Sequence, residues 1–128
     1  MNLDIGTDLP PTTSTPISRM DIAYMAVAMR DPNPVHTEDE FAQQAGLPGV
    51  IAHGTFPLGH AGAYLTTTFG PQAVLNYELR LTTPVFPGDQ LTTHGSVADR
   101  ADDHLTIDLT VTKNDGTTAA KGTAKVRT

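Results

Sequence analysis

The second half of the chain alternates apolar and polar residues, and this alternation constrains the fold more than any other feature of the sequence. A period of two places every second side chain on the same face of a β-strand, so each such segment predicts a strand with one apolar face. Four segments follow one another: Val74–Pro84, Leu91–Val97, Leu105–Thr112 and Thr118–Val126. Asn114-Asp115-Gly116 lies between the last two and is a hairpin signal. We therefore expect four consecutive antiparallel strands.

The first half of the chain predicts an extended lead-in followed by helices. Residues 1–16 contain Pro10-Pro11, which excludes a helix there, and we expect this lead-in to end as an edge strand over Thr12–Ile17. Three helices should follow: one with a Ser18–Asp21 capping box that ends before Pro32, a short one capped by Thr37, and a long buried one from His53 to Phe69. Gly59 and Gly62 in the long helix would let another backbone approach closely. Helices on one face of an antiparallel sheet make the fold class α+β, and one central helix wrapped by a curved sheet is its simplest packing.

Length, charge and composition exclude several classes of protein. The chain has 128 residues, which suits a single domain over residues 1–128, and a net charge of -6, which argues against nucleic acid as its main partner. It contains no cysteine, so disulfides, thiolate metal ligands and cysteine nucleophiles are excluded. No apolar run approaches the ~18 residues that a membrane span needs, and the first residues do not resemble a signal peptide. We expect a cytoplasmic protein, and the low aromatic content favours burial of one face against another chain.

The densest group of chemically active residues is Asp31-Pro-Asn-Pro-Val-His36. The two prolines hold Asp31, Asn33 and His36 on a stiff, non-helical segment, and rigid presentation of an acid/base pair is what a proton-transfer site requires. The same residues would also suit a helix end, a side-chain turn and a solvated histidine.

A second candidate segment is Ile51-Ala52-His53-Gly54, directly before the long helix. The free N–H groups of a helix N-terminus, with glycine allowing close approach, can hold a developing oxyanion. The alternative is a tight turn with a buried histidine. Asp31, His36 and His53 could also form a metal site, but their spacing matches no ligand motif, and we predict no metal. Neither a Gly-x-Ser-x-Gly elbow nor a phosphate-binding glycine loop is present.

These segments resemble a known family. Asp31-Pro-Asn-Pro-Val-His36, followed by Ala42, resembles the hydratase 2 motif of the MaoC-like dehydratases, the (R)-specific enoyl-CoA hydratases. Ala45–Pro48, Val50–Gly54 and Pro84–Asp89 resemble segments of that family in the same order. The resemblance implies the hot-dog fold, a curved antiparallel sheet around a long helix, and a dimer.

The resemblance also implies the roles of individual residues. Asp31 and His36 correspond to the pair that deprotonates water and delivers a proton to the α-carbon, and Asn33 to the residue that orients this pair. Gly54 corresponds to the backbone N–H that polarises the thioester carbonyl. We expect contacts with the substrate from His53, Thr55, Phe56 and Arg30. No metal or redox cofactor is implied, because the substrate is carried as a CoA or acyl-carrier thioester.

Arg30 departs from the family motif, which commonly has glycine before the aspartate. The arginine could pair with Asp31 and lower its pKa, or point towards an acyl-carrier phosphate. The predicted activity is (R)-specific hydration of trans-2-enoyl-CoA, or the reverse dehydration of a 3-hydroxyacyl thioester. The alternatives are one subunit of a heteromeric dehydratase for acyl or steroid side-chain substrates, and a non-catalytic acyl-thioester binding module. A hot-dog thioesterase fits the Asp31 and His36 pair less well.

Overall fold

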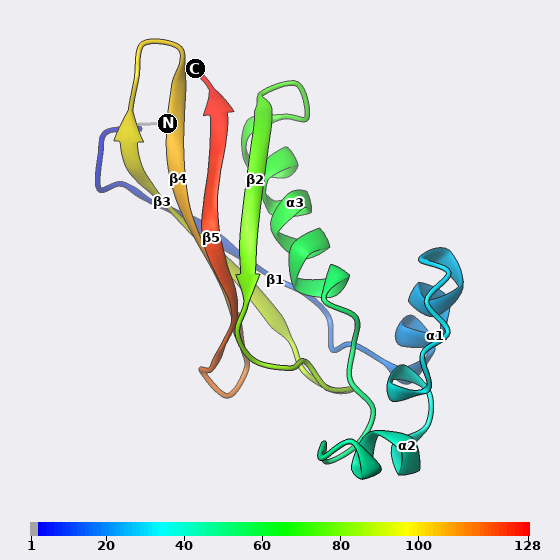
Figure 1. Ribbon diagram of the computed structural model, residues 1–128. Helices are drawn as coiled ribbons and strands as arrows, with labels where there is room; N and C mark the ends of the chain where they lie inside the picture. Colours follow the sequence, from blue (N-terminus) through cyan, green and yellow to red (C-terminus); the bar gives the residue numbers. More distant parts are fainter. Residues whose placement is uncertain (1–2) are drawn as a thin grey trace.

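One antiparallel sheet contains the four strands expected in the second half of the chain and a fifth from the N-terminal segment (Figure 1). The computed structural model describes residues 3–128. The strands are β1 (Asp8–Thr13), β2 (Val74–Leu81), β3 (Leu91–Arg100), β4 (His104–Lys113) and β5 (Thr118–Arg127). They lie in the order β1-β3-β4-β5-β2, and every neighbouring pair is antiparallel. The predicted α+β class is confirmed.

The N-terminal strand lies earlier than the sequence predicted. β1 covers Asp8–Thr13 rather than Thr12–Ile17, and it includes Pro10 and Pro11. The pairing of β1 with β3 is irregular across these two prolines. Because β1 lies at the edge of the sheet, the missing proline N–H groups leave no inner ladder broken, so the prolines are tolerated inside the strand.

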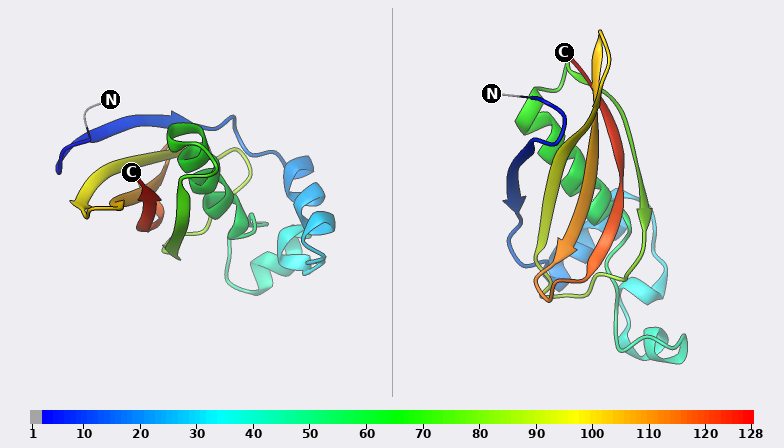
Figure 2. Two further views of the ribbon diagram at one scale, coloured as in Figure 1. Left: turned by 90° about the horizontal axis from the view of Figure 1, so that it is seen from above. Right: turned by 90° about the vertical axis from the view of Figure 1, so that its left-hand side faces the viewer.

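Helix α3 (Thr55–Phe69) lies across the concave face of the sheet, which curves around it (Figure 2). Its buried residues lie on one side, and they are Pro57, Ala61, Tyr64 and Leu65. Tyr64 and Leu65 belong to the same core cluster as Ile107 and Leu109 of β4. The long helix that we predicted to be buried is thus buried along one face, and several residues between these positions remain accessible.

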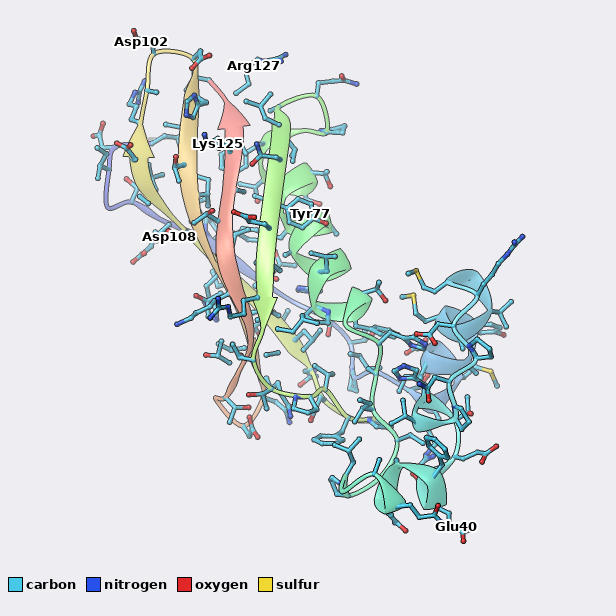
Figure 3. All side chains as sticks on the ribbon, viewed as in Figure 1. Glu40, Tyr77, Asp102, Asp108, Lys125 and Arg127 are labelled. Atoms are coloured by element: carbon cyan, nitrogen blue, oxygen red, sulfur yellow. The ribbon has the colours of Figure 1, made fainter. Side chains whose placement is uncertain are left out.

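Only one of the two helix glycines that we singled out lies against another element. A Cβ on Gly62 would lie 2.6 Å from the phenolic oxygen of Tyr77, whereas a Cβ on Gly59 would meet nothing within 4 Å. Tyr77 reaches from β2 to α3 and donates a hydrogen bond of 3.1 Å to the Leu58 carbonyl (Figure 3). The close neighbour at Gly62 is therefore the Tyr77 side chain of a strand, not a backbone, and Gly59 has no close neighbour.

Residues 18–53 form an overhang beside the sheet, with helix α1 (Arg19–Ala28), the 3-10 helix η1 (Pro34–His36) and helix α2 (Asp39–Gln44) (Figure 1). The capping box of α1 is present, since Ser18 Oγ accepts from the Asp21 N–H at 3.0 Å and Asp21 Oδ2 accepts from the Ser18 N–H at 2.9 Å. We had predicted that Thr37 caps the second helix, but it does not cap α2. It ends η1 instead, and Glu38 precedes α2 without a side-chain cap. None of the helices within residues 3–128 is long and apolar enough to cross a membrane.

Candidate active site

The segment that carries Asp31 begins where α1 is forced to end. Arg30 has a φ of 51°, in the left-handed region, and Pro32 prevents further helix. The Asp31 N–H still donates to the Ala26 carbonyl at 2.9 Å, which fixes the aspartate at the end of the helix. Its side chain is about half exposed, at 47%. Arg30 forms no ion pair with Asp31 in the part of the chain that the structure describes.

Asn33 positions the segment through the backbone. Its side-chain oxygen accepts from the Val35 N–H at 3.1 Å and caps η1, and its own N–H faces Asp31 Oδ1 at 3.4 Å. The expected orienting role of Asn33 therefore has a physical route: the amide holds the short helix whose last residue is His36.

His36 has a defined hydrogen-bond arrangement. Its Nδ1 lies 2.7 Å from the Ile51 carbonyl oxygen, which can only accept, so Nδ1 donates this hydrogen bond, and in the neutral ring the lone pair is on Nε2. The Ile51 N–H in turn donates to the Val35 carbonyl at 3.1 Å. Two hydrogen bonds, one from the His36 ring and one between backbone groups, thus join the 31–36 segment to the 51–54 segment.

His53 is stacked on His36. The ring centroids are 3.7 Å apart with an interplanar angle of 22°, and the His53 side chain is only 4% exposed. Asp31 Oδ2 lies 3.6 Å from His36 Nε2 and 3.9 Å from His53 Nε2. The structure therefore places one half-exposed carboxylate next to two imidazoles. The sequence had grouped the same three residues only as a possible metal site and had paired the carboxylate with His36 for proton transfer.

A metal ion fits this cluster poorly, although its three ligand atoms lie within 4.8 Å of one another. An ion bound by two imidazoles needs lone pairs that converge on one point in the planes of both rings. Rings that are stacked and nearly parallel hold their lone pairs in two separate planes, so the lone pairs do not converge on one ion. The arrangement suits proton transfer better than metal binding.

Gly54 lies immediately before α3 and next to His53. Its N–H has no acceptor among residues 3–128, and it points from the N-terminal end of a 15-residue helix. The helix dipole makes such an N–H a good donor to a developing negative charge. A carbonyl oxygen bound there would lie beside the Asp31, His36 and His53 cluster.

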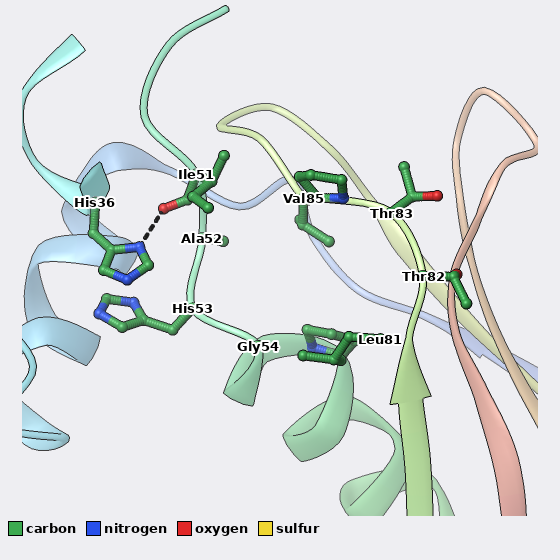
Figure 4. A pocket seen from close by; sticks show the side chains of 11 residues that line it. His36, Ile51, Ala52, His53, Gly54, Leu81, Thr82, Thr83 and Val85 are labelled. Carbon is green, nitrogen blue, oxygen red and sulfur yellow. Dashed lines mark hydrogen bonds between the residues drawn. The ribbon is translucent and has the colours of Figure 1, made fainter. Parts of the chain in front are cut away.

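Two cavities open on either side of Gly54. One, of about 330 Å³, contains Asp31 and is walled by the apolar residues Met29, Leu58, Leu79 and Leu81. The other, of about 320 Å³, contains His36 and runs along residues 81–85 (Figure 4). Of the remaining predicted substrate contacts, Thr55 lines the Asp31 cavity, and Thr55 and Phe56 also line a third hollow together with His60. Arg30 lines none of these three.

Asp39 ties the overhang together, a role that the sequence reasoning missed. Its carboxylate accepts from the Val50 N–H at 3.0 Å and pairs with Arg19 Nη2 at 2.8 Å. The Val50 hydrogen bond, followed by that of Arg19, lowers the pKa of Asp39 below its ordinary value. The sequence around Asp39 indicates only the start of a helix. Its two partners, Arg19 and Val50, lie far along the chain, so no local pattern indicated these contacts.

Lys113 supports the other side of the site and was also missed. The side chain is only 5% exposed, and its Nζ donates to the Pro84 carbonyl at 3.0 Å and pairs with Asp89 at 2.9 Å. The neighbouring Val85 carbonyl accepts from the Ala52 N–H at 2.7 Å, directly before His53. The one available signal in the sequence was the position of Lys113, which continues the apolar alternation of Leu109 and Val111. A lysine on the buried face of a strand needs a partner for its charge.

The comparison with known families agrees with this geometry. Residues 2–119 match the family described as MaoC like domain. The chain belongs to this family. The predicted hot-dog fold is confirmed for this MaoC-like chain, whose five-stranded sheet wraps one long helix.

Three similar proteins illustrate the range of the family. A UPF0336 protein of Saccharopolyspora erythraea is 32% identical over 94% of the MaoC-like chain and 91% of its own length. An (R)-specific enoyl-CoA hydratase of Rhodospirillum rubrum is 37% identical over 59% of the chain and 54% of its own length. The unliganded R-hydratase PhaJ1 of Pseudomonas aeruginosa superimposes with a TM-score of 0.86 and 28% identity, covering 97% of the chain and 81% of that structure.

Proposed function

We propose that the chain hydrates trans-2-enoyl thioesters to (R)-3-hydroxyacyl thioesters, or catalyses the reverse dehydration. The observation that carries this proposal is the placement of Asp31 Oδ2 3.6 Å from His36 Nε2, beside the free Gly54 N–H. The membership of this chain in the MaoC-like family and its similarity to R-hydratases support the same reaction.

The separation of Asp31 from His36 suits a shared water molecule. The two groups are too far apart for a direct hydrogen bond, yet both lone pairs can accept from one water. As the water oxygen bonds to C3, one of its protons passes to this pair, and the C2=C3 electrons move towards C2 and the thioester carbonyl. The protonated member of the pair then delivers a proton to C2, which completes the addition.

Gly54 would stabilise the charge that develops on the thioester oxygen. Its N–H and the N-terminal end of α3 face the same point, and removal of one such donor typically costs about 10²–10³-fold in rate. Acid/base chemistry of this kind uses neither a metal nor a redox cofactor, and CoA or an acyl carrier serves as the handle. His53 supports the His36 ring, and Thr55 lines the Asp31 cavity next to Gly54, whereas Phe56 lines the separate hollow that contains His60.

Arg30 would bind the phosphates of that handle. It is exposed at the C-terminal end of α1, one residue from Asp31, and its guanidinium is not engaged by the aspartate. Arginine is well suited to phosphate because it offers several donors in a planar fork.

The partner we propose is a second copy of the chain, which would cover the Asp31 cavity. The cavity is bordered by Met29, Leu58 and Leu81, which are 49%, 37% and 55% exposed. β2 is also the edge strand on this side of the sheet, and its outer backbone groups are available for pairing. Sedimentation of the purified chain distinguishes a homodimer from a monomer that requires a different hot-dog subunit.

The decisive experiment is hydration of crotonyl-CoA by the purified chain, followed as loss of enoyl-thioester absorbance. Asp31→Asn and His36→Gln should each lower kcat/KM by about 10²–10⁴-fold, because each removes one proton-transfer group. His94→Gln, at an exposed histidine outside the site, is the matched control and should retain full activity.

Three outcomes would contradict the proposal. Activity that survives both substitutions would remove Asp31 and His36 from the mechanism. Release of free CoA thiol from saturated acyl-CoA would indicate a thioesterase. Binding of acyl-CoA with no turnover, alone or with a partner chain, would indicate a binding module.

A further inference from the structure

The Asp31 cavity and the His36 cavity are neighbours, and a few shared residues form the wall between them. Only His53, Gly54 and Leu81 line both of them. His53 and Gly54 belong to the proposed chemistry, so Leu81 is the one shared residue whose side chain serves no step of that chemistry.

Leu81 is the last residue of β2 and is held in place by the sheet. Its backbone is in register with Ala120 of β5, which fixes where the side chain begins. The side chain reaches across to the start of α3 and lies against Gly54 (Figure 4). The contact is so close that a Cβ on residue 54 would overlap Leu81 Cδ1.

The side chain of Leu81 remains 55% exposed despite this contact. An exposed leucine contributes little to the core, and burial of such a side chain is normally worth about 1.5–3 kcal/mol. The fold therefore leaves the Leu81 side chain available to a substrate in the two cavities, also with a second copy of the chain over the rim of the Asp31 cavity.

The position of Leu81 relative to Gly54 indicates which atoms of a substrate it would touch. A thioester oxygen bound to the Gly54 N–H places the carbonyl carbon, and the C2 atom bonded to it, next to the atoms that contact Gly54. Leu81 Cδ1 is one of these. A substituent on C2 would compete with the leucine side chain for the same space.

We propose that Leu81 determines specificity by excluding acyl groups branched at C2, so that the wild-type chain selects unbranched 2-enoyl thioesters. This inference rests on the proposed function and deepens it. Leu81→Ala shortens the wall between the two cavities to a methyl group and makes room for the branch.

The turnover test compares crotonyl-CoA with its 2-methyl derivative, tigloyl-CoA. Leu81→Ala should raise the ratio of kcat/KM for tigloyl-CoA over crotonyl-CoA by about tenfold or more, since one methyl group in a fitted pocket is worth about 10–200-fold. Leu75→Ala is the matched control, because Leu75 is an exposed leucine of the same strand, at 44%, and lines neither cavity. An unchanged ratio in Leu81→Ala, or an equal rise in Leu75→Ala, would overturn the proposal.

A binding test separates this inference from the proposed function. Butanoyl-CoA and 2-methylbutanoyl-CoA have the same main chain and differ only in the methyl branch at C2, and neither can be hydrated. Calorimetric titration should show a preference of the wild type for butanoyl-CoA, and Leu81→Ala should lose it. If crotonyl-CoA is not turned over but this preference appears and disappears as stated, the hydratase proposal fails and the role of Leu81 stands. Equal binding of both thioesters by the wild type would refute the role of Leu81.

Discussion

The overhang of residues 18–53 and the body of sheet and α3 are held together in different ways. In β4, the apolar side chains of Leu105, Ile107, Leu109 and Val111 are all at most 1% exposed. Among the ten residues of α1 only Ile22 is buried, and among the six of α2 only Ala42 is. The body is stabilised by a continuous apolar core. The overhang contributes only a few side chains to that core, among them Ile22 and Ala52, and otherwise depends on hydrogen bonds and the Arg19–Asp39 ion pair.

The candidate active site lies between these two regions. Asp31 and His36 come from the overhang, and Gly54 begins the helix of the body. Sites that must admit a substrate are often drawn from the less stable part of a protein. The geometry of the proposed proton-transfer pair therefore depends on the region with the smaller core.

The largest expected difference between the regions is in hydrogen exchange. Amides of β4 should exchange only through global unfolding, at about 5–15 kcal/mol for a typical domain, while those of α1 should exchange through local opening at a small fraction of that. Native-state exchange read by mass spectrometry measures both. Equal protection at low protein concentration would contradict the comparison, and protection of α1 that rises with concentration would show that a second chain covers it.

Core truncations in the two regions should separate stability from activity. Leu65→Ala in α3 should lower the free energy of unfolding by about 2–5 kcal/mol, because it leaves a cavity in the main core. Ile22→Ala should lower it less, since α1 can detach while the body stays folded, yet it should lower crotonyl-CoA turnover more. Chemical denaturation and activity assays compare the two variants. A larger loss of global stability in Ile22→Ala would show that the overhang folds as part of the body.

A smaller effect is expected at Arg30, where the chain leaves α1. Arg30→Gly should raise the free energy of unfolding by about 0.5–1 kcal/mol, because glycine adopts a φ of 51° without the penalty that a side chain brings. Arg30→Ala keeps the Cβ and should show no such gain. In the same variants the KM for a CoA thioester should rise, so that stability and binding move in opposite directions in Arg30→Gly. A loss of stability in Arg30→Gly would mean that the guanidinium has a structural partner.

The smallest expected effect is a change in pH dependence at His60 of the body. Burial lowers the pKa of His60 below its ordinary 6.5, and its Nδ1 lies 2.7 Å from Thr93 Oγ1. Between the lowered folded pKa and about 6.5 the unfolded chain binds more protons, so stability rises with pH in this window and is lost as the pH falls. His60→Gln should flatten this part of the stability curve, and His94→Gln, at an exposed histidine, should not. An unchanged slope in His60→Gln would contradict the prediction.

The features that the sequence predicted correctly depend on near neighbours. The alternation around Leu105 gave the strand, and the Ser18–Asp21 capping box fixed the start of α1. The errors arose where a local signal had a competitor. Thr37 ends the η1 turn that begins at Pro34, so it does not cap the next helix. The N-terminal prolines are tolerated inside a strand because that strand lies at the edge of the sheet.

The candidate site was only partly predictable for the same physical reason. Asp31 and His36 share one stiff segment, so their proximity follows from spacing and from the family resemblance. The stacking of His53 on His36, and the support that Lys113 gives to Pro84, join residues far apart in the chain. Such contacts are decided by how the sheet and overhang pack, and no local pattern encodes them.

The buried Lys113 also has a consequence for the order of events during synthesis. The Ala52 N–H donates to the Val85 carbonyl, and Lys113, which lies 29 residues after Pro84, holds the carbonyl of that neighbouring proline. Contacts between residues so far apart in sequence form late, because the entropy of the intervening loop must be lost first. On the ribosome both histidines would emerge before this lysine, so a nascent chain would contain every proposed catalytic residue and still lack the support of Lys113.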